Sequence, residues 1–121
     1  MMFLIILLIL IIILIYFFKN KEKISNNTLI VRNFNTEWCG YSKKFQPTWD
    51  NLVNSNTNNN VQFQDIKCDD PKNNNICYDN NKYKINGFPQ ILFEDNNGNI
   101  STLNKPRTLE NILNTITYLL K

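Results

Sequence analysis

The first eighteen residues limit most strongly how this chain can fold. Every residue from Met1 to Phe18 is apolar or aromatic, most of them Ile or Leu, and lysines follow directly. Such a stretch has no polar face, so it does not suit the surface of a globular domain. Roughly 20 apolar residues, with about 17 as the lower limit, cross a bilayer as a helix. We therefore predict a single-pass transmembrane anchor over residues 1–18.

A cleavable signal peptide is the alternative interpretation of this run. No positive residue precedes the run and no small-residue cleavage site follows it, which favours a retained anchor. The lysines after the run favour a cytosolic domain by the positive-inside rule. Two glycosylation sequons, Asn26-Asn27-Thr28 and Asn99-Ile100-Ser101, are usable only in a secretory lumen. The side of the membrane therefore stays open.

The rest of the chain is divided into a linker over residues 19–28 and one domain over residues 29–121. The domain is rich in Asn, Lys and Asp, so only a modest core is available. The net charge of +3 is small, and the lysines form no basic stripe with interleaved aromatic residues. We therefore expect no binding of DNA or RNA.

The chain has no histidine and three cysteines. The absence of histidine excludes Ser/His and Cys/His hydrolases and histidine-ligated zinc, and three cysteines cannot build a Cys₄ zinc site. We expect neither a metal nor a cofactor. At most one internal disulfide can form, so one thiol must stay free or pair elsewhere.

Hydrophobic periodicity predicts a mixed α/β domain. The predicted strands lie near residues 29–34, 61–66, 91–93 and 100–103, with a hairpin turn over 95–99 joining the last two. The predicted helices cover residues 41–53, with Pro47 inside, residues 76–84, and residues 109–120, with Thr108 as the N-cap. This order implies a mixed sheet with helices on both faces.

Cys39 is placed where a cysteine is reactive. It lies between a predicted strand and the start of a helix, where unpaired backbone N–H groups and the helix dipole stabilise a thiolate. Trp38 would shield one side of the sulfur, and Gly40 would let the backbone of a partner approach closely. Lys43 and Lys44 add positive potential one turn further on.

The segment Trp38-Cys39-Gly40-Tyr41-Ser42, with a proline eight residues after the cysteine, resembles the active-site stretch of the thioredoxin and protein disulfide isomerase family. Gly87-Phe88-Pro89-Gln90 resembles the strand entry of that family, where the proline is cis and faces the active cysteine. The resemblance covers residues 29–121 and implies a thioredoxin-like fold without its first strand and helix. It also implies that Phe88, Pro89 and Gln90 contact a client peptide.

Two departures from the family pattern change the expected chemistry. Ser42 stands where the family has its resolving cysteine, so Cys39 can attack a disulfide but cannot expel the product through an internal bridge. Asn33 stands where the family has a buried acid. Arg32 falls inside a strand that should be buried, which leaves the register of that strand open by one residue.

Cys68 and Cys77 resemble a cysteine pair of some protein disulfide isomerase domains, in which the pair can form a structural bridge. Oxidised, the pair would contribute about 2–3 kcal/mol. Reduced, the two would be small core residues, as expected in the cytosol. A role of either one in resolving Cys39 is disfavoured by the family geometry.

We therefore expect a membrane-anchored monothiol protein that exchanges or isomerises disulfides of cysteine-containing client proteins through Cys39. A thioredoxin fold kept as a peptide-binding or structural membrane protein, with Cys39 incidental, is the alternative. A third interpretation compares Cys39-Gly40-Tyr41-Ser42 with the site of monothiol glutaredoxins, which hold iron-sulfur clusters. Trp38 and the proline in the helix argue against it.

Overall fold

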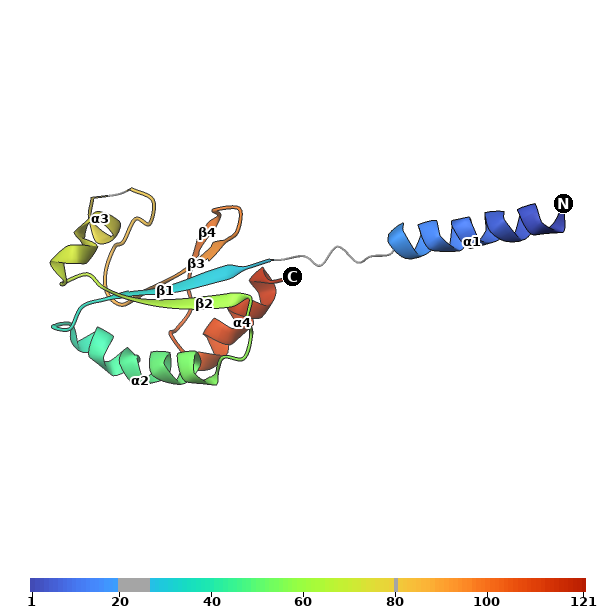
Figure 1. Ribbon diagram of the computed structural model, residues 1–121. Helices are drawn as coiled ribbons and strands as arrows, with labels where there is room; N and C mark the ends of the chain where they lie inside the picture. The colour runs from blue at the N-terminus through green and yellow to red at the C-terminus, as the bar shows by residue number, and fades with distance from the viewer. Residues whose placement is uncertain (20–26, 80) are drawn as a thin grey trace.

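A computed structural model describes residues 1–19, 27–79 and 81–121 of the chain (Figure 1). The elements are, in order, α1 (Met2–Lys19), β1 (Leu29–Asn35), α2 (Gly40–Ser55), β2 (Val61–Lys67), the 3-10 helix η1 (Pro71–Asn73), α3 (Asn74–Cys77), β3 (Gln90–Asp95), β4 (Ile100–Thr102) and α4 (Leu109–Leu119). Most of the predicted linker, residues 20–26, lies outside the described residues.

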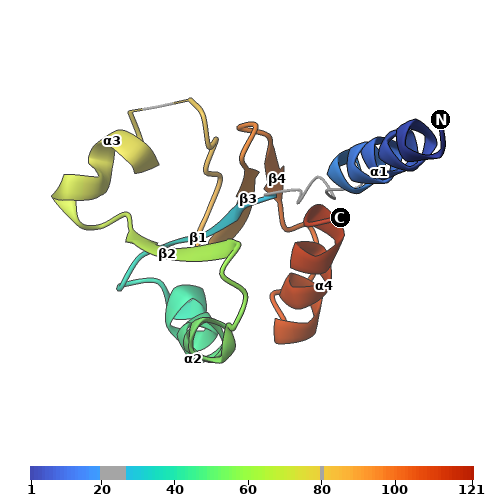
Figure 2. The same ribbon diagram turned by 45° about the vertical axis from the view of Figure 1, so that its right-hand side comes forward.

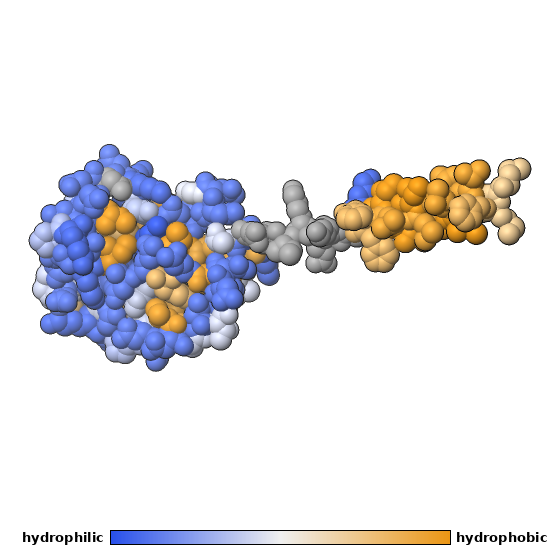
Figure 3. Space-filling model, in the orientation of Figure 1, coloured by the Kyte–Doolittle hydropathy of each residue, from blue (hydrophilic) through white to orange (hydrophobic). Residues whose placement is uncertain are grey.

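The helix α1 is long enough and apolar enough to cross a membrane. Among the described residues, no other helix meets both conditions. None of its residues is buried against the rest of the chain. In Figure 3 the visible face of α1 is hydrophobic along most of its length, whereas the visible face of the domain is mostly hydrophilic with hydrophobic patches. The helix is therefore not part of the domain core.

The four strands form one mixed sheet in the order β2-β1-β3-β4. β1 pairs in parallel with β2 and antiparallel with β3, and β4 pairs antiparallel with β3. A parallel pair needs a long crossover connection, which α2 provides between β1 and β2. Helices cover both faces as predicted, with α2 and α4 on one face and α3 on the other (Figure 2).

Two hydrophobic clusters hold these layers together. The larger one joins the sheet to α2 and α4, and Trp49 and Ile112 at its centre are almost completely buried. The smaller one lies on the opposite face, where Phe34, Tyr83 and the two cysteines Cys68 and Cys77 pack together. The sheet is thus packed on both sides, as a thioredoxin-like fold requires.

The register of β1, which the sequence left open by one residue, pairs Arg32 with Gln64 and Leu92, and the charge of Arg32 is satisfied. The side chain is buried and forms an ion pair with Glu94 in β3, while its Nε donates to Gln64 at 2.9 Å. Glu94 also accepts from Lys82 at 2.6 Å and from the Tyr83 hydroxyl at 3.0 Å. A buried charge is tolerated where it is paired and hydrogen-bonded in this way.

The prediction of a helix over residues 76–84 was wrong. The helical segment begins earlier, because the Asp70 side chain accepts from the Lys72 backbone N–H and Pro71 occupies the first turn. It ends at Cys77, and the described residues that follow form no helix before β3. Lys84 has a positive φ of 46°, which a continuing helix cannot contain.

β1 connects the two ends of the domain. Its first residue, Leu29, lies at the end nearest to α1 in the sequence, and its last residue, Asn35, leads through three residues to Cys39 (Figure 1). The strand therefore places Cys39 beyond the end of β1 that is opposite to Leu29.

Candidate functional site

Cys39 occupies the N-cap of α2. Its backbone is extended, with φ of −81° and ψ of 122°, and its carbonyl accepts from the Lys43 N–H at 3.0 Å in the first hydrogen bond of the helix. No side chain caps the helix at this point. The thiol is partly exposed and is the free cysteine of the chain. The sulfur is therefore accessible at a helix start, as the sequence predicts.

The surroundings of Cys39 favour its thiolate. The Ser42 backbone N–H lowers the pKa of Cys39 most, and partial burial, which raises the pKa, does not cancel this effect. The Tyr41 N–H, the Ser42 hydroxyl and the positive charge of Arg107 lower the pKa further. Because the thiolate is the nucleophile, this arrangement prepares the sulfur for attack.

The loop before β3 lies directly beside the sulfur. The Phe88–Pro89 peptide bond is cis, and the Phe88 carbonyl oxygen is 3.7 Å from Cys39 Sγ. The rings of Trp38 and Phe88 meet edge to face with their centres 6.3 Å apart. Trp38 and Tyr41 remain largely exposed. The structure thus brings Cys39 and Pro89 together with exposed aromatic side chains around them.

The remaining members of the predicted site differ in exposure. Gly40 is exposed, and a Cβ added there would meet no atom within 4 Å, so the space beside Cys39 is open. Gln90 is partly buried, and its side-chain oxygen accepts from the Asn86 N–H at 2.9 Å. The side-chain oxygen of Gln90 therefore stabilises the loop that carries Pro89.

Ser42 is buried beneath Cys39. Its hydroxyl accepts from the Thr36 backbone N–H at 3.3 Å, which joins the start of α2 to the segment after β1. In addition, it lowers the pKa of the Cys39 thiol through a hydrogen bond. A serine cannot form a disulfide, so its role here is to hold the loop and to stabilise the thiolate.

Asn33 lies fully buried in β1, on the same face of the strand as Val31 and Asn35. Neither polar atom of its amide has a hydrogen-bond partner among the described residues. An amide left unpaired in the interior costs about 1–3 kcal/mol. Unlike a carboxylate, the Asn33 amide cannot accept a proton near neutral pH. Asn33 therefore cannot replace the buried acid of the family pattern in proton transfer.

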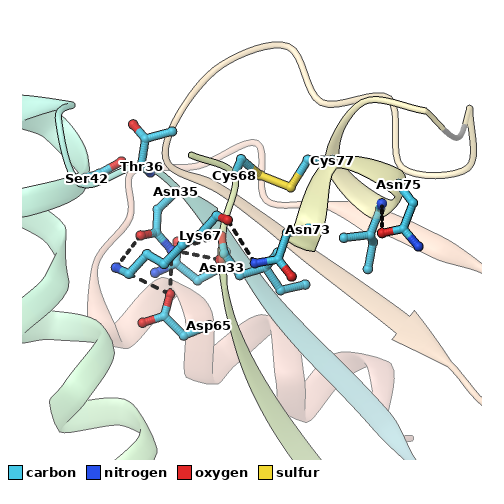
Figure 4. The surroundings of a disulfide bond; sticks show 12 residues. Asn33, Asn35, Thr36, Ser42, Asp65, Lys67, Cys68, Asn73, Asn75 and Cys77 are labelled. Carbon is cyan, nitrogen blue, oxygen red and sulfur yellow. Dashed lines mark hydrogen bonds and ion pairs between the residues drawn. A yellow bond between two sulfur atoms is a disulfide. The ribbon is translucent and has the colours of Figure 1, made fainter. Parts of the chain in front are cut away.

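A polar cluster surrounds the end of β1 near α2 (Figure 4). The Asn35 amide donates to Asp65 at 2.5 Å, and Lys67 donates to the Asn35 oxygen at 2.5 Å and to Gln46 at 3.1 Å. Lys67 also lies 3.7 Å from Asp65. These contacts tie β1, β2 and α2 together at the point where the chain turns toward Cys39.

Cys68 and Cys77 are joined in a disulfide, which Figure 4 shows between the end of β2 and α3. Both are buried, in the cluster on the α3 face of the sheet. In this state neither thiol is free to resolve Cys39. The pair therefore corresponds to the structural bridge that the family resemblance implies.

Arg107 is the site residue that the sequence analysis missed. It is exposed just before α4, and its charge acts on Cys39, 68 residues earlier in the chain. No local sequence pattern around Arg107 predicts this charge effect, because only the packing of α4 beside α2 brings Arg107 toward Cys39.

Comparisons with known proteins agree with this geometry. The thioredoxin family model matches residues 16–118. A protein disulfide-isomerase from Zea mays is 27% identical over 95 residues, which cover 76% of this chain and 18% of that protein. A mitochondrial thioredoxin domain-containing protein from Schizosaccharomyces pombe is 36% identical over 64 residues, covering 53% of this chain and 16% of that one.

Solved structures show the same fold. The first thioredoxin domain of mouse protein disulfide-isomerase A4 has a TM-score of 0.62 at 18% identity, covering 88% of this chain and 69% of that one. The zinc-bound form of human ERp44 has a TM-score of 0.61 at 20% identity, covering 84% and 30%. The chain spans less than a quarter of the length of the curated relatives that it matches.

Proposed function

Because the chain belongs to the thioredoxin family, we propose that it carries out thiol-disulfide exchange through Cys39 alone. One observation carries the proposal. The Cys39 sulfur lies at the start of α2 with a lowered pKa, 3.7 Å from the carbonyl of the loop that contains Pro89. The other two cysteines are occupied in their own disulfide.

The reaction begins when the Cys39 thiolate attacks one sulfur of a client disulfide. The client S–S bond breaks, a mixed disulfide forms, and the second client sulfur leaves as a thiolate. The N–H groups of Tyr41 and Ser42 lower the pKa of Cys39 and so keep more of the attacking sulfur in its thiolate form. Trp38 and Phe88 offer apolar surface to the client beside the new bond.

Release then requires a thiol from outside the site. A second cysteine of the client, or a small thiol, attacks the mixed disulfide and returns Cys39 as a thiolate. When the second client cysteine attacks, electrons are conserved within the client and the outcome is isomerisation. Ser42 supports this monothiol cycle because it stands one turn from Cys39 and offers no second sulfur.

Trapping of adducts tests the exchange reaction. Membranes that contain the full chain are alkylated rapidly, and the disulfide-linked partners are identified by mass spectrometry without reduction. We expect the adducts to vanish in Cys39→Ser. An unchanged set of partners in Cys39→Ser would contradict the proposal.

The variant Ser42→Cys tests the monothiol character separately. It restores a second thiol at the spacing of the family motif, so we expect the mixed disulfides to disappear faster than in the natural chain. Ser42→Ala serves as the matched control, since it changes the same position without adding sulfur. Adducts of equal lifetime in Ser42→Cys and Ser42→Ala would argue against the monothiol cycle.

We also propose that α1 anchors the domain on the lumenal side of a secretory membrane. The length and full exposure of α1 support the anchor. The Cys68–Cys77 disulfide supports an oxidising compartment, whereas the lysines after α1 would favour the cytosol.

Sealed microsomes test the anchor and its side. We expect the domain to be protected from added protease, to resist extraction by carbonate, and to keep residues 1–18 in its intact mass. Loss of a glycan in Asn99→Gln would add support, because Asn99 is exposed in a sequon. Digestion of the domain in sealed vesicles would overturn the lumenal assignment, and a mass without residues 1–18 would overturn the anchor.

A further inference from the structure

A groove with a volume of about 750 Å³ lies beside the loop that carries Pro89. Its walls come from the chain before β3, from β3 and β4, and from Arg107. Thr102 and Leu103 form part of the wall on the β4 side. This volume is sufficient for several side chains of a peptide.

The groove lies beside the reactive sulfur, although Cys39 itself is not among the residues that line it. Phe88 and Pro89 line it, and the Phe88 carbonyl oxygen is the atom 3.7 Å from Cys39 Sγ. Arg107 also lines the groove, and its charge lowers the pKa of Cys39. A client joined to Cys39 by a disulfide would thus have this groove next to its bonded cysteine.

The charges along the groove have one sign. Three cations, Lys82, Lys84 and Arg107, line it, and none of the described lining residues is acidic. Lys82 is engaged by Glu94. Lys84 and Arg107 are exposed and form no ion pair with any residue that the structure describes. These two side chains are therefore the ones that can receive a ligand.

A second hollow strengthens the positive field. Arg107 also lines a space of about 350 Å³ beside α2, together with Tyr41 and Lys44. On the opposite edge of the sheet, the Glu37 N–H donates to the exposed Asp69 carboxylate, so two acidic residues lie near the β2 side of Trp38. The surroundings of Cys39 are thus positive toward β3 and β4 and of mixed sign toward β2, where Lys43 and Lys67 line a hollow together with Glu37.

We propose that the preferred clients carry Asp or Glu within a few residues of the cysteine that joins Cys39, and that Lys84 and Arg107 receive these carboxylates. This inference rests on the proposed exchange function. Complementary charges mainly raise the rate of encounter, by 10-fold to 10³-fold at low ionic strength. The preference should therefore weaken as salt is added.

Model peptides test the preference with the full chain in a non-ionic detergent. Each peptide has one cysteine in a mixed disulfide with thionitrobenzoate, and its flanking residues are Asp and Glu, Asn and Gln, or Lys. Cys39 bonds to the peptide sulfur, and thionitrobenzoate leaves as a coloured thiolate, so the reaction needs no further oxidant or reductant. We expect the acidic peptide to react about tenfold faster than the neutral one at low salt.

Variants of the groove separate charge recognition from reactivity. In the double variant Lys84→Gln/Arg107→Gln we expect the ratio of the acidic to the neutral rate to fall close to one. The ratio is the quantity to compare, because the loss of Arg107 also affects the Cys39 thiolate toward every peptide. The control Lys72→Gln/Lys121→Gln removes the same charge outside the groove and should keep the ratio.

The outcomes distinguish this inference from the function on which it rests. Equal rates for the three peptides, all lost in Cys39→Ser, would overturn the acidic preference and leave the exchange function standing. Rates that do not change in Cys39→Ser would overturn the exchange function and this inference with it. A preference that survives in Lys84→Gln/Arg107→Gln would overturn the assignment to this groove.

Discussion

Reduction of the Cys68–Cys77 disulfide should destabilise the domain by a predictable amount. The two cysteines are nine residues apart. Closing a loop of this length removes about 9 cal/mol/K of entropy from the unfolded chain, so the bridge contributes about 2.6 kcal/mol at 25 °C. For a domain of this size, 1 kcal/mol shifts the melting temperature by about 4–8 °C. Reduction should therefore lower the melting temperature by about 10–20 °C.

Thermal unfolding of Cys39→Ser with and without a phosphine reductant measures this effect. The substitution prevents Cys39 from exchanging with the bridge, and the fluorescence of buried Trp49 reports unfolding. The further variant Cys68→Ala/Cys77→Ala in the same background should not respond to the reductant. If the mass proves that the bridge is reduced while the melting temperature moves by less than about 3 °C, the loop-entropy argument fails for this domain.

Three further predictions concern Glu94 and Cys39. Glu94→Gln should cost about 3 kcal/mol in urea unfolding, because it leaves buried Arg32 without its charge partner, and Arg32→Leu/Glu94→Leu should cost less. Burial raises the pKa of Glu94, but hydrogen bonds from Lys82, Tyr83 and Arg32 outweigh it, so the net shift is downward. The stability that ionised Glu94 contributes to the fold is complete above the pKa of an unfolded glutamate, and it is lost as the pH falls through the lower folded pKa. Acid should therefore destabilise the natural chain more than it destabilises Glu94→Gln. Alkylation of Cys39 should reach half its maximal rate at lower pH than in the urea-unfolded chain, because its pKa is lowered, whereas equal midpoints would favour a peptide-binding protein without catalysis.

Local signals were sufficient for much of the fold. The hairpin over residues 95–99 forms as predicted, with Asp95 accepting from the Asn97 and Asn99 N–H groups. The last helix begins after Thr108, whose side chain accepts from the Asn111 N–H at 3.2 Å. Both features depend on hydrogen bonds between residues close in sequence, so the residue types alone reveal them.

Features that depend on tertiary packing could not be predicted in the same way. The sequence places Arg32 in a buried strand but does not indicate that Glu94, 62 residues later, satisfies its charge. The sequence analysis also passed over the Asp70 cap and Pro71, and therefore placed the third helix too late. Arg107 reaches the neighbourhood of Cys39 only through the packing of α4.

The position of Cys39 at the far end of β1 sets the working distance of a tethered sulfur. If α1 is seated in the bilayer as proposed, the ten Cα–Cα steps from Lys19 to Leu29 extend at most about 35 Å. The seven residues of β1 add about 23 Å. The four steps from Asn35 to Cys39 add at most about 14 Å, so the reactive sulfur stays within about 70 Å of the lipid surface. Under the proposed function, clients that are themselves held at the membrane would meet this sulfur by diffusion in two dimensions.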